Sequence, residues 1–366
     1  MIMKKRTLFF ALAATVLLCN SCLGVENPEP REVAVISGIY LLNNGSWGGN
    51  NSNIAAYDYN SKSINDNLFY KANGKNLGDL GQDMIVYGSK IYTAVGGSGV
   101  VFVTDLNGKI LSEVRAGGEG NWQPRALTAL KGNVFISYYE GYVGRIDTVG
   151  FNLTLSGNVG PNPEGIAAAN DKVYLAVSNG LNYPDFDSTV VVIDPSSLAV
   201  KSRLTAGINP GKLAACGNNV FCLCQGNYSD IPAKISIIYD DGNGNDLVTE
   251  CTYPMTPIQN GIASDGIRYV FIACSSGKNC RIVALDNFSG LVHDESFVKD
   301  GTQFSNSVCS LDIDPLNHVL FVGTSDYVNN GDMYVFTQDG CLFDKFDTGG
   351  INPIRVAFSS EIITIR

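Results

Sequence analysis

The chain has 366 residues, of which 45% are hydrophobic and 16% are charged, and it contains 40 glycines, 17 tyrosines and 17 phenylalanines. This composition excludes an intrinsically disordered chain and is typical of a folded all-β protein with many turns. The formal net charge of −10 argues against nucleic acid or an anionic lipid surface as a partner.

The N-terminus has the pattern of an export signal. Three cations at positions 4 to 6 precede an apolar run over residues 8–18, which is shorter than the roughly 20 residues that span a bilayer, and a small residue and Cys22 follow. The pattern resembles a lipoprotein signal, in which the cysteine after the cleavage site is lipidated; a plain secretory signal is the alternative. We therefore expect a signal peptide over residues 1–21, lipidation of Cys22, a tether over residues 22–36, and membrane attachment through the lipid alone.

Apolar runs of strand length, with an aromatic residue in second place, recur along the rest of the chain. Their aromatic residues lie 39 to 52 residues apart, a spacing typical of a β-propeller or another repeat array. These residues are Tyr40, Tyr92, Phe135, Tyr174, Phe221, Phe271 and Phe321. Each run is followed by a second β-branched run, and the second runs end at Asp58, Asp105, Asp147, Asp194, Asp240, Asp286 and Asp339. Aspartate at a strand end accepts hydrogen bonds from the next turn, so we assign these residues to turns rather than to metal binding.

A third run of small residues precedes the aromatic strand from the second repeat onward. It reads "QPRALTAL", "NPEGIAAA" and "NPGKLAAC" in three successive repeats. Proline forces an extended entry, and small residues allow close packing near an axis, so this run is the expected innermost strand. We name the four strands of one repeat a, b, c and d, from the axis outward.

The two ends of the chain complement each other. The first repeat begins with a b strand, and "NPIRVAF", which starts at Asn352, matches an a strand. Pairing them leaves no open sheet edge. The sequence therefore predicts an all-β protein, a seven-bladed β-propeller over residues 37–366 whose C-terminal strand completes the first blade. The final run "EIITIR" has no place in this scheme, since it looks like a b strand whose position is already occupied.

The chain resembles the YncE-like seven-bladed propellers of surface lipoproteins, and within them the BtuG-type cobalamin-binding lipoproteins. The resemblance is carried by "GIYLLNNGSW", "LFYKANGKNLGDLGQDMIV" and "NNGDMYVFTQDGCLFDKFDTGGINP". It implies a lipid-anchored protein on the outer face of the outer membrane that captures a corrinoid and delivers it to a TonB-dependent outer-membrane transporter. No individual ligand contact carries over from that family.

A ligand is expected on the propeller face that carries the b to c loops and the d to a connections. These loops combine aromatic residues with asparagine and glycine, which can stack on a flat ligand and hydrogen-bond its polar rim. The predicted ligand-binding residues are Asn44, Trp47, Asn50, Trp122, Arg125, Tyr138, Tyr142, Asn182, Tyr183, Phe186, Lys212, Tyr228, Asn260, Tyr327 and Asn329. One polar residue begins each inner strand; the set is Gln82, Arg125, Glu164, Lys212, Asn260, Asn306 and Arg355. The alternatives are that the aromatics pack on neighbouring blades and that the polar residues line a hydrated channel.

Metal and haem sites are disfavoured by the sequence. Its two histidines, His293 and His318, fall in an outer strand and in a turn on the opposite face. The acidic segment over residues 240–246 lacks the final glutamate of a calcium loop and is expected to be a hairpin turn. We expect no metal and no cofactor.

Cysteines are concentrated in the C-terminal half. Cys222 and Cys224 alternate on one strand and are expected to be core residues on one face. Cys274 and Cys280 flank a short loop, and we hypothesise a disulfide between them, since export permits one.

The leading hypothesis is therefore a non-enzymatic protein that captures a small molecule. One alternative is a propeller hydrolase or lactonase that uses Glu164, Asn260 and Asn306 around a channel cation. Another is a module that binds glycans or proteins.

Overall fold

A computed structural model describes residues 30–117, 122–251, 256–276 and 279–365. The chain divides into two compact units. Residues 34–361 form the large unit, and the described part of the small one comprises residues 30–33 and 362–365. The predicted signal peptide and Cys22 lie outside the described residues.

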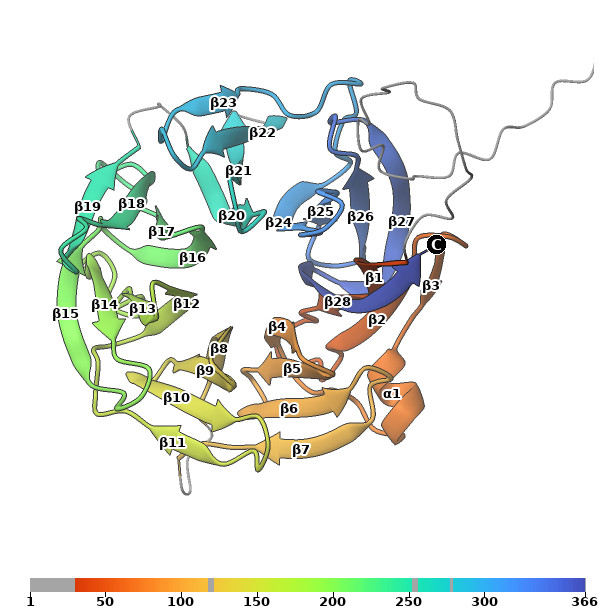
Figure 1. Cartoon of the computed structure of the whole chain (residues 1–366), viewed down its shortest axis with the longest axis horizontal. Coiled ribbons are helices and arrows are strands. Elements are labelled where there is room, and N and C mark those ends of the chain that lie inside the picture. The colour runs from red at the N-terminus through yellow and green to blue at the C-terminus, as the bar shows by residue number, and fades with distance from the viewer. Residues whose placement is uncertain (1–29, 118–121, 252–255, 277–278, 366) are drawn as a thin grey trace, which may run out of the picture. The chain divides into compact units, whose positions relative to one another are not determined.

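In the described part of the chain, the strands form seven four-stranded antiparallel sheets arranged as blades around one axis (Figure 1). The first blade, from the axis outward, is β28 (Pro353–Ile365), β1 (Arg31–Asn43), β2 (Asn53–Asp58) and β3 (Ser63–Asn65). The next three are β4 (Gly81–Tyr87), β5 (Lys90–Val95), β6 (Val100–Asp105) and β7 (Ile110–Val114); β8 (Pro124–Leu130), β9 (Asn133–Tyr138), β10 (Tyr142–Asp147) and β11 (Leu153–Leu155); and β12 (Pro163–Ala169), β13 (Lys172–Val177), β14 (Thr189–Ile193) and β15 (Val200–Thr205). The last three are β16 (Pro210–Cys216), β17 (Asn219–Cys224), β18 (Lys234–Asp240) and β19 (Asp246–Glu250); β20 (Pro257–Ser264), β21 (Tyr269–Ser276), β22 (Asn279–Asp286) and β23 (Val292–Asp294); and β24 (Ser307–Ile313), β25 (Leu320–Ser325), β26 (Asn330–Phe336) and β27 (Leu342–Ile351). The predicted all-β, seven-bladed propeller is confirmed.

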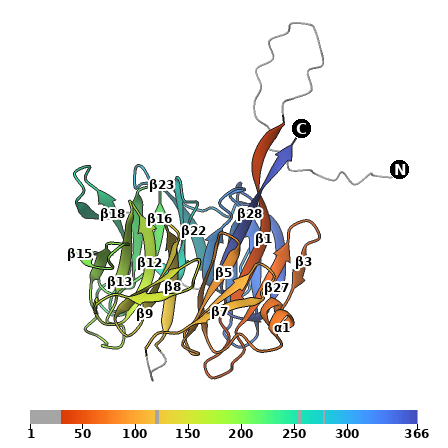
Figure 2. The ribbon, with the colours of Figure 1, turned by 60° about the horizontal axis from the view of Figure 1, so that its bottom comes forward.

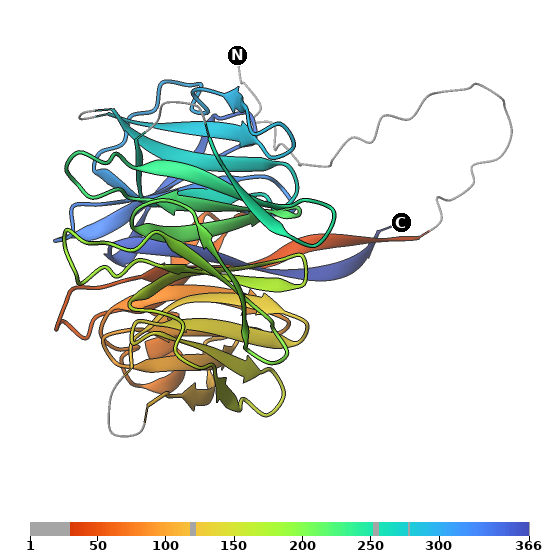
Figure 3. The same cartoon turned by 90° about the vertical axis from the view of Figure 1, so that its left-hand side faces the viewer.

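The first blade is closed by the C-terminal strand, as predicted. β28 lies beside β1 in the same sheet, and the views along and across the blades show the two strands side by side (Figures 2 and 3). Residues 361–365 of the final run continue β28 rather than forming an additional b strand. β1 begins at Arg31, so part of the segment expected to be a tether is strand, because Val33 and Val35 alternate with exposed neighbours and are half-buried.

The apolar core lies between blades. One cluster joins Tyr92 of β5 and Val103 of β6 to Val134 of β9 and Ile146 of β10, which belong to the next blade. Most of the aromatic residues of the b strands are among the largest fully buried side chains, and burying each contributes about 1.5–3 kcal/mol. A short helix, α1 (Leu68–Asn73), precedes β4 and buries Phe69 against Phe102, with ring centroids 4.9 Å apart.

Most of the predicted aspartate caps are confirmed. Asp58, Asp105, Asp147, Asp194, Asp240 and Asp286 each accept hydrogen bonds from backbone N–H groups of the following turn. Asp339 differs, because β26 ends at Phe336 and the Thr337 hydroxyl accepts the Cys341 N–H in that turn. The acidic segment over residues 240–246 is the hairpin turn between β18 and β19, as predicted.

One of the two cysteine predictions is confirmed and the other is wrong. Cys222 and Cys224 are buried in one cluster with their sulfur atoms 3.7 Å apart, as predicted for core residues on one face. The predicted disulfide between Cys274 and Cys280 is wrong, because both are free thiols. β21 and β22 extend to Ser276 and Asn279, so Cys274 pairs with Arg281, one position beyond Cys280. The two side chains therefore project from opposite faces and pack in different clusters.

The aspartate caps predict a loss of stability in acid. Hydrogen bonds from the Gly150 backbone, and from Arg268, are the largest causes that lower the pKa values of Asp147 and Asp286 to about 2, from an ordinary value of 3.8. A carboxylate with a depressed folded-state pKa stabilises the fold above the unfolded-state pKa, and this contribution is lost as the pH falls through the folded-state pKa. The melting temperature is therefore expected to decrease as the pH falls from 3.8 towards about 2.

Calorimetric melting of the Asp147→Asn variant across this range tests the assignment. Its melting temperature should depend less on pH than that of the wild type, whereas Asp339→Asn, at an exposed residue, should leave the dependence unchanged. An equal pH dependence in all three proteins would contradict it.

Candidate functional site

The site is built from an irregularity at the start of the inner strands. In six blades the pairing between strands a and b shifts register there, so the a strand has extra residues opposite its partner. β8, for example, pairs Pro124 with Tyr138 and Leu127 with Ile136, which leaves Arg125 and Ala126 opposite one residue. A bulge of this kind re-aims side chains at the end of a strand. The bulges contain Gln82, Arg125, Glu164, Lys212, Asn260 and Cys309, which all line one cavity.

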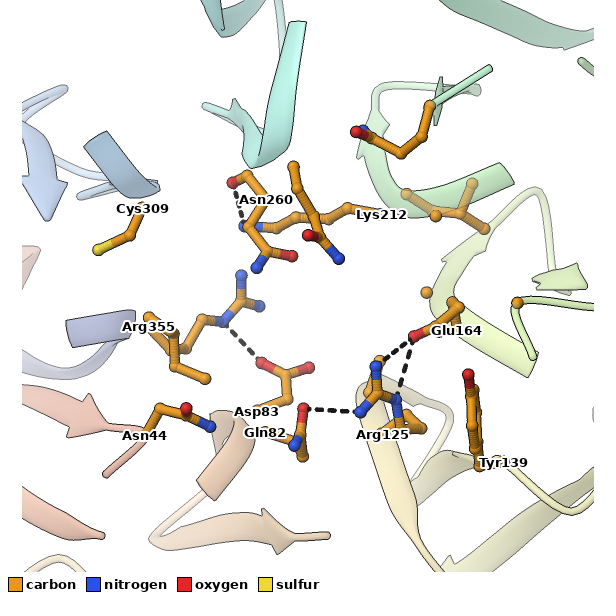
Figure 4. A pocket seen from close by; sticks show the side chains of 18 of the residues that line it. Asn44, Gln82, Asp83, Arg125, Tyr139, Glu164, Lys212, Asn260, Cys309 and Arg355 are labelled. Atoms are coloured by element: carbon orange, nitrogen blue, oxygen red, sulfur yellow. Dashed lines mark hydrogen bonds and ion pairs between the residues drawn. The ribbon is translucent and has the colours of Figure 1, made fainter. Parts of the chain in front are cut away.

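This cavity has a volume of about 630 Å³ and lies at the axis (Figure 4). Besides the strand starts, b to c loops contribute Tyr139, Tyr183, Phe186, Tyr228 and Tyr327 to its lining. A second cavity of about 390 Å³ is lined by later residues of the same inner strands. Lys212 and Arg355 line both cavities, so they lie where the two meet along the axis.

Arg125 organises one side of the cavity. Its Nε and one terminal nitrogen donate to Glu164 Oε2 at 3.0 and 2.8 Å, and its other terminal nitrogen donates to Gln82 Oε1 at 3.1 Å (Figure 4). The guanidinium carbon lies 4.9 Å from the centroid of the Tyr139 ring. Burial raises the pKa of Glu164, while the adjacent Arg125 charge opposes that rise. These contacts fix the side chains of Arg125 and Glu164, which come from two adjacent blades.

Arg355 connects three blades. It comes from β28 and forms ion pairs of 3.0 Å with Asp83 of β4 and with Asp312 of β24. Burial raises the pKa of Asp312, and the Arg355 charge opposes that rise. Because β28 completes the first blade, these ion pairs also tie the closing strand to both neighbouring blades.

Lys212 has a different environment from the two arginines. Its Nζ donates to the backbone oxygen of Asn260 at 3.1 Å, and no described carboxylate lies within ion-pair distance. Burial lowers the pKa of the Lys212 ammonium; the nearby Asp312 charge opposes this shift, and the nearby Arg355 charge adds to it. The polar residues at the inner strand starts form the floor of the cavity. This floor therefore contains one cation, Lys212, without a carboxylate in contact.

Three aromatic residues form a group at the edge of the cavity. Phe186 makes edge contacts with Tyr183 and Tyr228, with both pairs of ring centroids 5.8 Å apart. Tyr183 and Tyr228 are 65% and 64% exposed. The Tyr228 hydroxyl accepts a hydrogen bond from Asn209 Nδ2 at 3.1 Å. Exposed rings supported in this way can stack on a ligand with little loss of conformational entropy.

Comparison with known proteins identifies the family. Residues 37–222, about half of the chain, match the family described as a domain of unknown function, DUF5074. The chain belongs to this family. A search of curated proteins finds no significant match.

Solved structures support the propeller architecture. A protein from Lactobacillus plantarum has a TM-score of 0.61 at 15% identity, over 89% of this chain and 100% of its own. A putative 6-phosphogluconolactonase from Bacteroides fragilis NCTC 9343 has a TM-score of 0.61 at 15% identity, over 88% of this chain and 98% of its own. A streptogramin B lyase has a TM-score of 0.54 at 12% identity, over 73% of this chain and 82% of its own. At these identities the likeness shows the fold alone.

Eight of the predicted residues of this DUF5074 protein come together in the cavity. They are Asn44, Arg125, Tyr183, Phe186, Lys212, Tyr228, Asn260 and Tyr327. Of the other polar residues expected at the inner strand starts, Gln82, Glu164 and Arg355 line it and Asn306 does not. Asp83 and Gln225 line the cavity without having been predicted to bind ligand, and so does Tyr139, which is one of the loop aromatics expected on this face. The signal for Asp83 was its place beside Gln82 in the strand start, and that for Tyr139 was its place in the loop "YYEGY".

Seven predicted residues are outside the cavity lining. Trp47, Asn50, Asn182 and Asn329 are exposed on the loops. The Asn329 amide donates to Asp326 at 2.7 Å within its own loop, and the Asn182 amide donates to the Asp185 backbone at 3.3 Å.

The expectation that Tyr138 contacts ligand is wrong, because it ends β9 and is buried in the core with 1% exposure. Trp122 stacks on Tyr142 with centroids 4.5 Å apart and meets Tyr138 edge-on. All three belong to or pack against the apolar cluster between this blade and the preceding one, which is the alternative that the sequence left open.

The described residues include neither a metal-binding cluster nor a membrane-spanning helix. They contain no group of three or more histidine, cysteine, aspartate or glutamate residues that could hold a metal ion. Over the same residues, no helix is both long and apolar enough to cross a bilayer.

The ion pairs of Arg355 predict a large effect of its removal. Arg355→Met leaves Asp83 and Asp312, which are mostly buried, without their cation, and should lower the free energy of unfolding by about 2–4 kcal/mol. Arg125→Met leaves only Glu164 unpaired and should cost less. Urea denaturation measures both; an Arg355→Met variant as stable as Arg125→Met would contradict the role of Arg355 in closure.

Proposed function

We propose that this protein captures a small molecule at the axial cavity without transforming it, and that a corrinoid is its ligand. The observation that carries the proposal is a cavity with a polar, largely ion-paired floor below exposed aromatic rings. Polar floor groups can orient a ligand, and the rings supply apolar contact area.

The state of the carboxylates favours binding over hydrolysis. Glu164 is held by Arg125, and Asp83 and Asp312 are held by Arg355. A general base must be free to accept a proton from the attacking nucleophile. A carboxylate that is already paired with a guanidinium is poorly suited to that task. The same side chains are well suited to a rigid binding surface, since their positions are fixed before a ligand arrives.

The size and chemistry of the cavity fit a corrinoid seated at its mouth. Small-molecule sites occupy about 300–1,000 Å³, and this cavity is of that class. A corrinoid is a broad ring with amide side chains around its edge. Its ring can lie across the aromatic group while part of its edge enters the polar floor. The sequence resemblance to BtuG-type lipoproteins supports the same ligand.

The cellular setting of the proposal rests on the sequence. The N-terminal pattern supports export and lipidation at Cys22, and therefore attachment to the outer membrane through the lipid. The resemblance to BtuG-type proteins supports delivery of the ligand to a TonB-dependent transporter. We propose this arrangement together with the ligand.

Titration of the soluble chain with cyanocobalamin in a calorimeter tests the ligand. We expect saturable binding, and Tyr183→Ala should weaken it by roughly tenfold, since loss of an aromatic stacking contact costs about 1 kcal/mol or more. The melting temperature should change little, because Tyr183 is 65% exposed.

Two further variants show where the ligand lies. Tyr70→Ala removes an exposed tyrosine of α1 and should leave binding unchanged. Trp47→Ala removes a ring that is 79% exposed and outside the cavity lining, so weaker binding in this variant would mean that the ligand extends onto the first b to c loop. Absence of saturable binding at micromolar cyanocobalamin would overturn the corrinoid assignment, and turnover of a lactone that a chelator abolishes would favour a hydrolase instead.

Attachment through Cys22 is tested in cells by metabolic labelling with a fatty-acid analogue. The wild-type chain should be labelled and recovered with the outer membrane, whereas Cys22→Ser should be unlabelled. Cys341→Ser, which changes an exposed cysteine of the propeller, is the matched control and should be labelled. Equal labelling of the Cys22→Ser variant would contradict the lipoprotein assignment.

A further inference from the structure

The cavity floor holds a cation that lacks a direct counter-ion. The Lys212 ammonium can donate three hydrogen bonds, and the structure gives it one acceptor, the Asn260 backbone oxygen at 3.1 Å. The two carboxylates whose charges act on Lys212, Asp83 and Asp312, are both bound to Arg355. Among the described residues, Lys212 is therefore the cavity cation without an ion pair.

A neutral donor lies on the same wall of the cavity. Gln225 follows β17 in the blade that carries Lys212, and both residues line the cavity. The Gln225 amide nitrogen is buried and has no hydrogen-bond partner among the described residues. Rotation of the side-chain amide would direct its N–H groups into the cavity. This wall thus combines an ammonium and an amide that both have unused donors.

Arg355 adds positive charge at the same depth. It lines the cavity with Lys212, and its charge is close enough to lower the pKa of the Lys212 ammonium. Figure 4 shows the Arg355 guanidinium directed toward the open centre and the Lys212 side chain extending to the Asn260 backbone. Asp312 and Asp83, which pair with Arg355, offset its repulsion of Lys212, so the attraction for an anion comes mainly from the Lys212 ammonium itself.

The free-energy cost of burying Lys212 without a counter-ion favours a partner that comes from the ligand. A desolvated ammonium without a counter-ion destabilises a fold, and removing a polar group of this kind is often neutral or stabilising. The adjacent arginines both have carboxylates within 3.0 Å, so the fold can supply such partners where stability alone is at stake. A partner that arrives with the ligand would compensate the cost at Lys212.

We propose that Lys212, with Gln225 beside it, forms a subsite for an oxyanion, a phosphate-type or carboxylate group of the ligand. The proposal rests on the proposed function in that it takes this cavity to be the ligand site. It goes further in assigning an anionic group to the ligand and in placing that group on the wall formed by β16 and β17.

The test uses the full mature chain in a buffer free of phosphate and sulfate. Inorganic phosphate and, in a separate arm, acetate are titrated at constant ionic strength while the melting temperature and the heat of binding are recorded. At least one of the two anions should bind to the wild type and raise its melting temperature. Lys212→Met should bind that anion roughly tenfold to hundredfold more weakly, since it removes a charged hydrogen-bond donor. The arm that responds identifies the oxyanion.

Three controls separate a binding role from a structural one. Lys212→Arg keeps the charge and should retain anion binding, and Lys201→Met, at an exposed site on β15, should bind like the wild type. Without anion, Lys212→Met should melt at the same temperature as the wild type or higher. A Lys212→Met variant that melts lower and still binds the anion normally would show that Lys212 is structural and would overturn the proposal, as would failure of both anions to bind the wild type.

A corrinoid arm keeps this inference distinct from the proposed function. Cyanocobalamin contains a phosphodiester, and cobinamide lacks it. If the subsite holds that group, Lys212→Met should weaken the binding of cyanocobalamin but not that of cobinamide. Anion binding that depends on Lys212 without any corrinoid binding would support the subsite and reject the corrinoid. Corrinoid binding that is unchanged in Lys212→Met, with no anion binding, would support the corrinoid and reject the subsite.

Discussion

Closure of the ring by the last strand is the constraint on which the site depends. β28 brings Arg355 to the axis, where it pairs with Asp83 and Asp312 on the two adjacent blades. These ion pairs hold the start of the last inner strand beside the start of β4. Only in the closed ring do the inner strands of all blades converge, so the cavity is a property of the complete propeller rather than of any blade. Arg355 therefore contributes both to the closure of the ring and to the lining of the cavity.

A repeated backbone irregularity provides the chemistry. Regular pairing at the starts of the inner strands would alternate their side chains between the two faces of each blade, both of which pack on neighbouring blades. The bulges interrupt this alternation, so that Arg125, Glu164 and Lys212 face the axis instead. The cost is a few missing ladder hydrogen bonds at each strand start. The gain is a floor whose residue types can vary without changing the packing between blades.

The repeats allowed the fold to be predicted, and the loops limited prediction of the site. Periodic aromatic residues and a matching C-terminal strand indicate closure because both depend on local pattern. Whether a loop aromatic points to the cavity depends on where its strand ends: Tyr138 is the last residue of β9 and is buried, whereas Tyr139, the next residue, lines the cavity. The same parity separates Cys274 from Cys280, since Cys280 pairs with Ser275 rather than with Cys274, which puts the two cysteines on opposite faces. A single sequence does not fix a strand end to one residue.

The pairing of the first and last strands also has a consequence for biogenesis. While the chain is being made, β1 has no inner partner, and the six other blades can stack before the first is complete. The growing chain is therefore an open ring with an unpaired edge at β1 until its C-terminal residues emerge. The axial cavity is therefore completed only when β28 pairs, and a chain clipped before Pro353 lacks the strand that brings Arg355 to it.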